Sequence, residues 1–126
     1  MRITASAVSL NVDDVAASAA FARDHLGFTE DMSADGFVSL SRADAGFNLI
    51  YLRPDLPTLK PERLRQRRAD GLIIVFVVDD VDAEFARLSA KGAPIATAIE
   101  TERGASDSSR SVIRVVFFQF VQWVTA

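Results

Sequence analysis

The residues best suited to acid–base chemistry are two pairs of adjacent aspartates, each within a Val-Asp-Asp-Val motif. The first pair is Asp13–Asp14 and the second is Asp79–Asp80. Neighbouring carboxylates can supply one general acid and one general base. Each pair, however, stands directly before an Ala-rich, helix-like run, where an aspartate accepts hydrogen bonds from the first helical N–H groups. Because the motif occurs twice at this boundary, we interpret Asp13 or Asp14, and Asp79 or Asp80, as helix caps.

Nucleophilic catalysis finds little support in the composition. The chain has no cysteine and a single histidine, His25. The lack of cysteine excludes disulfides, thiolate metal sites and cysteine nucleophiles. His25 lies near the end of the first helix-like run, before Gly27, where it complements the helix dipole. A serine nucleophile therefore has no suitable base, and no glycine-rich phosphate loop is present.

A proline-rich segment, residues 53–71, separates the two helix-like runs. It contains a basic cluster made of Arg63, Arg65, Arg67 and Arg68. Such a cluster can bind an anion, but Glu62 and Asp70 flank it and no aromatic residues interleave with it. We interpret the segment as a solvated linker.

The composition is that of a globular domain. Of its 126 residues, 49% are hydrophobic and 25% charged, and the net charge is −3. This charge gives no reason to expect nucleic acid or an anionic membrane as a partner, and it leaves a neutral or cationic ligand open. The N-terminus lacks a signal-peptide pattern, and the longest apolar run suits a buried strand rather than a membrane span. We therefore expect a cytoplasmic protein.

The same order of strand, helix and further strands occurs twice in the chain. Val12 in the first copy aligns with Val78 in the second, so the period is about 65 residues. That period is too long for a solenoid repeat. The pattern predicts helices over 14–26 and 80–91, stopped by Gly27 and Gly92, with one strand before each helix and further strands after it.

The expected fold is α+β, a single domain over residues 1–126. Two βαβββ modules, at about 3–53 and 71–124, are joined by a linker at 54–70. Each module leaves one face of its sheet open, so we expect the two to pair into a curved, cup-shaped mixed sheet with helices on the outer face.

Two motifs carry a resemblance to a known family: Phe-x-Arg-Asp-x-Leu-Gly-Phe at residues 21–28, and the strand and Val-Asp-Asp-Val block at 71–83. Over about residues 5–102 the chain resembles the vicinal oxygen chelate superfamily, which includes glyoxalase I, extradiol dioxygenases and bleomycin-resistance proteins. In character it is similar to the metal-free, bleomycin-resistance-type members. The resemblance implies two paired βαβββ units, often completed as a homodimer.

Enzymes of that superfamily hold a divalent metal in the cup through His, Glu or Gln side chains. The resemblance places the four ligand positions on Ala7, Asn48, Ile73 and Gln119. Two of these side chains are aliphatic and two are neutral amides, whereas a catalytic metal site needs about three protein donors. We therefore expect no metal, no cofactor and no catalytic residue of the family type.

Strand alternation then identifies the side chains that line the cup. They are apolar, with a few amides and two aromatic rings, which suits a small hydrophobic or aromatic molecule. The expected ligand-binding residues are Asn48, Ile50, Ile73, Phe117, Gln119 and Trp123. The aromatic pair could instead belong to the core or to a dimer interface.

The expected function is metal-independent binding of an antibiotic-like small molecule, as in antibiotic resistance. The alternative is a metal-dependent lyase, isomerase or dioxygenase of the same superfamily, and a third possibility is a folded relic without a ligand. The expected partners are a small molecule and a second copy of the chain. Pairing of the modules within one chain or between two chains stays open.

Residues 103–114 depart from the family pattern, which resembles Pro-Trp-Gly-x-Arg-x-Phe-x-Val-x-Asp-Pro. The chain has Arg-Gly-Ala-Ser-Asp-Ser-Ser-Arg-Ser-Val-Ile-Arg instead. A suitable choice of codons for a family-like segment yields these residues after the loss of one base. A frame-shifted stretch and a natural sequence are therefore both open, and the intact mass of the purified protein distinguishes them.

Overall fold

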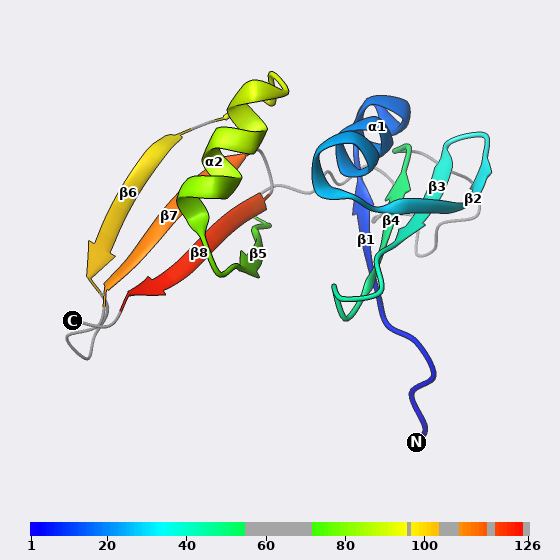
Figure 1. Ribbon diagram of the computed structural model, residues 1–126. Helices are drawn as coiled ribbons and strands as arrows, with labels where there is room; N and C mark the ends of the chain where they lie inside the picture. The colour runs from blue at the N-terminus through cyan, green and yellow to red at the C-terminus, as the bar shows by residue number, and fades with distance from the viewer. Residues whose placement is uncertain (55–71, 96, 104–108, 116–117, 125–126) are drawn as a thin grey trace. The chain divides into compact units, whose positions relative to one another are not determined.

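The computed structural model describes residues 1–54, 72–95, 97–103, 109–115 and 118–124, with the backbone alone for 97–103, 109–115 and 123–124 (Figure 1). The chain divides into two compact units, Met1–Asp70 and Gly71–Ala126. The second unit begins where the second module is expected. Each unit is described by itself.

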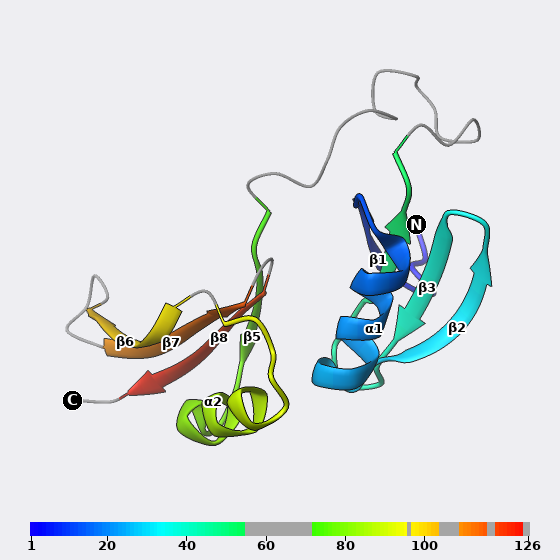
Figure 2. The ribbon, with the colours of Figure 1, turned by 90° about the horizontal axis from the view of Figure 1, so that it is seen from above.

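The described part of unit 1 is a four-stranded sheet with a helix, α1, on one face (Figure 2). Its elements are β1 (Ala7–Asn11), α1 (Val15–Leu26), β2 (Thr29–Ala34), β3 (Phe37–Ser41) and β4 (Asn48–Leu52). The strand order is β1-β4-β3-β2, with β1 and β4 parallel and the other pairs antiparallel.

Unit 2 has the same organisation. Its elements are β5 (Ile74–Val77), α2 (Val81–Ala90), β6 (Thr97–Arg103), β7 (Ser109–Val115) and β8 (Phe118–Val124). The order is β5-β8-β7-β6, again with the first and last strands parallel. These two mixed sheets confirm the predicted α+β fold built from repeated βαβββ modules. Strand β7 lies largely inside the stretch that departs from the family pattern.

The helix boundaries follow local capping chemistry. Asp14 Oδ1 accepts from the Ala17 N–H at 2.9 Å, and Asp80 Oδ1 accepts from the Ala83 N–H at 3.0 Å. The structure thus assigns the cap to the second aspartate of each pair. Gly27 ends α1 with φ of 71°, a left-handed conformation that glycine adopts without a Cβ penalty.

Side chains from outside the helices satisfy a backbone group at the C-terminal end of α1 and at the N-terminal end of α2. The Arg42 guanidinium donates to the carbonyl oxygen of Leu26 in the last turn of α1. Gln122 Oε1 on β8 accepts from the Val81 N–H at 2.9 Å, which satisfies the first amide of α2. Each contact joins a helix end to its own sheet and satisfies a backbone group that the helix leaves unpaired.

The core of each unit lies between its helix and its sheet. Burial alternates along β3 and β4, so every second side chain faces α1. In unit 1 the buried hydrophobic residues are Leu10, Val12, Ala19, Ala22, Leu26, Phe28, Val38, Leu40, Leu49 and Tyr51. In unit 2, Phe76 stacks on Phe118 with ring centroids 5.7 Å apart, and its ring lies 5.9 Å from that of Phe120.

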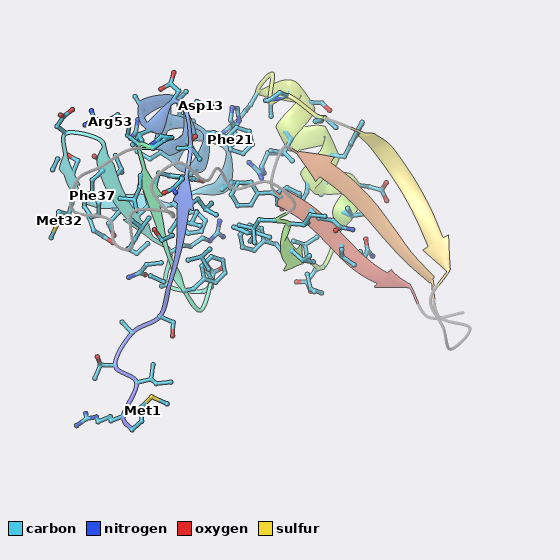
Figure 3. The ribbon with its side chains drawn as sticks, turned by 180° about the vertical axis from the view of Figure 1, so that it is seen from behind. Met1, Asp13, Phe21, Met32, Phe37 and Arg53 are labelled. Atoms are coloured by element: carbon cyan, nitrogen blue, oxygen red, sulfur yellow. The ribbon has the colours of Figure 1, made fainter. Side chains whose placement is uncertain are left out.

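Met1 lies far from the sheet at the end of an exposed N-terminal segment (Figure 3). Among the described residues, no helix is long and apolar enough to cross a bilayer.

The capping assignment predicts unequal effects within one aspartate pair. Replacing Asp80 by Ala leaves the Ala83 N–H without its side-chain acceptor, so the free energy of unfolding should fall by about 1 kcal/mol. Asp79→Ala, one residue away, should change it far less. Urea denaturation of both variants measures the difference, and equal losses would contradict the assignment.

Burial of Tyr51 predicts a loss of stability in alkali. Desolvation raises the pKa of Tyr51 from its ordinary value of 10.0 to about 12. The unfolded chain therefore releases the phenol proton at a lower pH than the folded chain does, and stability falls as pH rises from 10 towards 12.

Tyr51 is the only tyrosine, so phenolate absorbance follows it directly. The native protein should titrate well above the ordinary value, and Tyr51→Phe should remove this part of the pH dependence of unfolding. Native absorbance that rises at the ordinary pKa would show that the phenol is not desolvated.

Candidate functional site

Among the described residues of unit 1, no helix lies on the face of the sheet opposite α1, and we call this face the open face. Register aligns its side chains in rows across the strands. Ser9 lies beside Ile50, which lies beside Ser39, and Asn11 lies beside Leu52, which lies beside Phe37. On three of the four strands, the open face therefore comprises Ala7, Ser9 and Asn11 of β1, Phe37, Ser39 and Ser41 of β3, and Asn48, Ile50 and Leu52 of β4. Strand β2 extends the rows, with Met32 beside Ser39 and Ala34 beside Phe37.

These side chains are small, polar but uncharged, or apolar. Those of β3 and β4 are half-buried, whereas Ala7 and Ser9 on β1 are exposed. The row Ser9–Ile50–Ser39 thus alternates polar and apolar side chains, whereas in the next row one amide, Asn11, precedes two apolar side chains. Such a surface can hold a molecule by apolar contact and hydrogen bonding.

Charges lie at the margins of unit 1, and several are paired. At the bulge in β2, Asp31 Oδ1 accepts from the Ser41 hydroxyl at 2.9 Å. Arg53 pairs with Asp35 at 3.1 Å. The Arg42 hydrogen bond holds the pKa of Asp44 below its ordinary value, partly offset by desolvation.

On the corresponding face of unit 2, the burial of side chains differs from strand to strand. Gln119 and Val121 of β8 are buried, with exposed fractions of 6% and 1%. Val75 and Val77, their partners on the edge strand β5, are 49% and 63% exposed, and Ile73 just before that strand is 55% exposed. An apolar stripe of three side chains, Ile73, Val75 and Val77, therefore borders a buried amide.

The expected ligand-binding residues fall into both units. Asn48 and Ile50 lie together on the open face of unit 1. Gln119 is buried in unit 2 and Ile73 is exposed beside β5. Trp123 lies on β8, and only its backbone is described. Phe117 lies outside the described residues.

The internal repeat shows which positions correspond between the units. The Val12 N–H donates to the Leu52 carbonyl at 2.9 Å, and the Val78 N–H donates to the Val121 carbonyl at 2.8 Å. Leu52 therefore corresponds to Val121. Two residues earlier on each strand, Ile50 corresponds to Gln119, so register favours Ile50 over Asn48 as the second metal-ligand position.

This correspondence tests whether the chain's residues fit a family-type metal. The four equivalent positions are Ala7 and Ile50 in unit 1, and Ile73 and Gln119 in unit 2. Three aliphatic side chains and one neutral amide do not provide the donors that a divalent ion needs. Among the described residues, no group of three His, Asp or Glu side chains could hold a metal either. The side chains at these four positions therefore do not fit a divalent metal of the family type.

Sequence reasoning did not select β3 as part of the site. Phe37 and Ser39 share rows with Leu52 and Ile50, so they belong to the same surface. The sequence pattern at residues 37–41, Phe-Val-Ser-Leu-Ser, could have identified them. Its alternation marks Val38 and Leu40 as core and leaves the other three residues for the opposite face. Gln122 was also missed, since a glutamine on a strand does not by itself indicate a helix cap.

Comparisons with solved structures agree with the repeated module. The chain is similar to a glyoxalase/bleomycin resistance protein/dioxygenase from Nocardioides, with a TM-score of 0.70 and 18% identity over 100% of this chain and 87% of that one. It is also similar to lactoylglutathione lyase from Agrobacterium tumefaciens, with a TM-score of 0.64 and 21% identity over 96% and 94% of the two chains. TioX from Micromonospora sp. ML1 gives a TM-score of 0.67 and 16% identity over 95% and 98%.

At these identities the structural likeness shows the fold alone. A comparison with curated proteins finds no match. The model of the Glyoxalase/Bleomycin resistance protein/Dioxygenase superfamily matches residues 4–109, which is most of the 126-residue chain. This match, together with the two βαβββ modules, shows that the chain belongs to the glyoxalase/bleomycin resistance protein/dioxygenase superfamily.

Proposed function

We propose that this member of the superfamily binds a small hydrophobic or aromatic molecule, of the kind found among antibiotics, without a metal ion. The observation that carries the proposal is the correspondence between the units, which puts Ala7, Ile50 and Ile73 at three of the four ligand positions. Without oxygen or nitrogen donors there, substrate activation by a family-type metal has no support from this chain's own residues.

The side chains of the open face and Gln119 favour binding of such a molecule. Covering half-buried side chains such as Ile50 and Leu52 releases water from apolar area, at roughly 25 cal/mol per Å². The amides add direction, because a buried amide without a partner costs about 1–3 kcal/mol. Gln119, which is 6% exposed, therefore needs a hydrogen-bond partner from the protein, a water or a ligand.

We also propose that the protein works as a homodimer in the cytoplasm. Strand β5 lies at the edge of its sheet, and with the residue before it carries the exposed apolar stripe of Ile73, Val75 and Val77. A flat apolar edge strand is a ready surface for association, which soluble proteins commonly block with charge. A second copy of the chain would cover this stripe and complete a binding surface.

The dimer proposal predicts a dimer mass by light scattering at micromolar concentration. Val77→Lys puts a charge into the stripe and should shift the protein towards monomer. Ala16→Lys, on the exposed side of α1, adds the same charge elsewhere and should leave the mass unchanged. A monomeric native protein would refute the dimer.

Ligand binding can be followed through Trp123, the only tryptophan. Chelator-treated protein should show quenching or a wavelength shift on titration with bleomycin or with a polyaromatic antibiotic. Calorimetry should show weaker binding for Trp123→Ala. Trp123→Phe should lose less, since aromatic stacking contributes about 0.5–1.5 kcal/mol beyond area burial.

The competing outcome is an enzyme of the same superfamily, such as a metal-dependent lyase, isomerase or dioxygenase. Elemental analysis that finds stoichiometric metal would favour it. So would chelator-treated protein that binds none of these compounds, yet converts a hemithioacetal or a catechol once a divalent metal is added.

A further inference from the structure

We propose that the turn between β2 and β3, made by Asp35 and Gly36, is a site of spontaneous backbone modification. At this site aspartate converts in the folded protein to isoaspartate, its β-linked isomer, and Arg53 slows the conversion. The modification belongs to unit 1 and does not depend on which ligand the protein binds.

The β2–β3 hairpin reverses direction over these two residues (Figure 1). Strand β2 ends at Ala34 and β3 begins at Phe37, and these two residues are paired across the hairpin. Asp-Gly is a favoured pair for such a turn, and Gly36 has a left-handed φ of 73°. The Asp35 side chain is 91% exposed, so water reaches its carboxyl group freely.

The residue that follows an aspartate decides how readily the carboxyl group reacts with the backbone. The Gly36 nitrogen attacks Cγ of the Asp35 carboxylic acid, a C–N bond forms, and the hydroxyl leaves with the amide proton as water. Water then opens the cyclic imide at Cγ, which restores aspartate, or at the α-carbonyl, which leaves the chain linked through Cγ. A following side chain hinders the attack, and glycine has none. Of the aspartates that the structure describes, only Asp35 precedes a glycine.

The turn lies in a part of the sheet that deforms easily. Strand β2 is at the edge of the sheet, every residue of it is exposed, and a bulge interrupts its pairing between Glu30 and Met32. A hairpin end with few buried contacts opens at a lower free energy than the core does. The Gly36 nitrogen and Asp35 Cγ can therefore approach each other while β3, β4 and α1 stay folded.

Arg53, directly after β4, restrains the turn through two hydrogen bonds. Its backbone N–H donates to the Gly36 carbonyl at 2.9 Å, and its guanidinium donates to Asp35 Oδ1 at 3.1 Å. Movement of the carboxyl group onto the Gly36 nitrogen breaks the second bond. Because the Arg53 and Asp35 side chains are 47% and 91% exposed, this restraint is weak, and it slows the reaction without preventing it.

Isoaspartate would change the hairpin around it. The β-linkage adds one methylene group to the backbone and leaves the former α-carboxyl group as a side group. The twist of a two-residue turn then no longer matches the strands that it joins, Ala34 and Phe37 being the paired residues beside it. Strand β3 keeps its pairing with β4, so the loss of pairing should fall on β2.

Incubation of the native protein in water enriched in heavy oxygen tests the site, because each ring opening adds one oxygen from the solvent. Trypsin releases residues 24–42, which include Asp35, and residues 69–87, which include the second Asp-Gly pair of the chain. Mass spectrometry should find the label in peptide 24–42 of the folded protein. An isoaspartate-specific carboxyl methyltransferase should methylate the same peptide. A urea-unfolded sample gives the rate for the unrestrained chain.

Three variants assign the reaction to particular groups. Asp35→Glu keeps the charge beside Arg53 but must close a larger ring, so labelling of the peptide should fall to the background from Asp24 and Asp31. Arg53→Gln removes the ion pair and keeps the backbone hydrogen bond. It should raise the rate about two- to fivefold, the factor that corresponds to an exposed ion pair. Arg2→Gln removes a charge from the exposed N-terminal segment and should leave the rate unchanged. Thermal unfolding verifies that each variant is folded during the incubation.

Three outcomes would overturn the inference. Label that enters peptide 24–42 of the unfolded chain but not of the native protein would show that the folded turn prevents the reaction. Equal labelling of the native protein and Asp35→Glu would place the reaction at another aspartate. Equal rates for Arg53→Gln and Arg2→Gln would show that the ion pair does not restrain the turn.

Discussion

The parallel pairing of the first and last strands of each module is the constraint on which the rest of this structure depends. Two parallel strands cannot be joined by a tight turn, so the chain must cross over between them, and the crossover contains the helix. The helix then covers one face of the sheet. Among the described residues the opposite face has no helix, and this division separates the core residues of β3 and β4 from those of the candidate site.

Helix capping supports that division in both modules. Asp14 and Asp80 cap the N-terminal ends of the helices. Arg42, just after β3, and Gln122, on β8, each bond a backbone group at a helix end. The contacts differ between the modules: an arginine holds the C-terminal end of α1, and a glutamine holds the N-terminal end of α2. Two modules of the same topology have thus reached similar packing with different residues.

The chemistry of the site follows from positions that the repeat makes equivalent. One strand-to-strand hydrogen bond in each module shows that Ile50 and Gln119 occupy matching places. In a superfamily whose enzymes use such places for metal ligands, this chain has mostly aliphatic side chains. The backbone of the module is retained without the donors, and hydrophobic contact with neutral hydrogen bonding is the chemistry that its surface offers.

Much of this architecture was determined by the sequence, because it depends on neighbours in the chain. Capping aspartates, a glycine stop and alternating strands act over a few residues, so helix positions, strand positions and the repeat could be predicted. The pairing register could not, since it depends on contacts between strands some 40 residues apart, such as Ser9 with Ile50. Tertiary structure alone decided that Ile50 rather than Asn48 matches Gln119, that β3 joins the open face, and that Gln119 is buried while Val75 beside it is exposed. Burial is set by everything that packs around a side chain, and no local pattern contains that information.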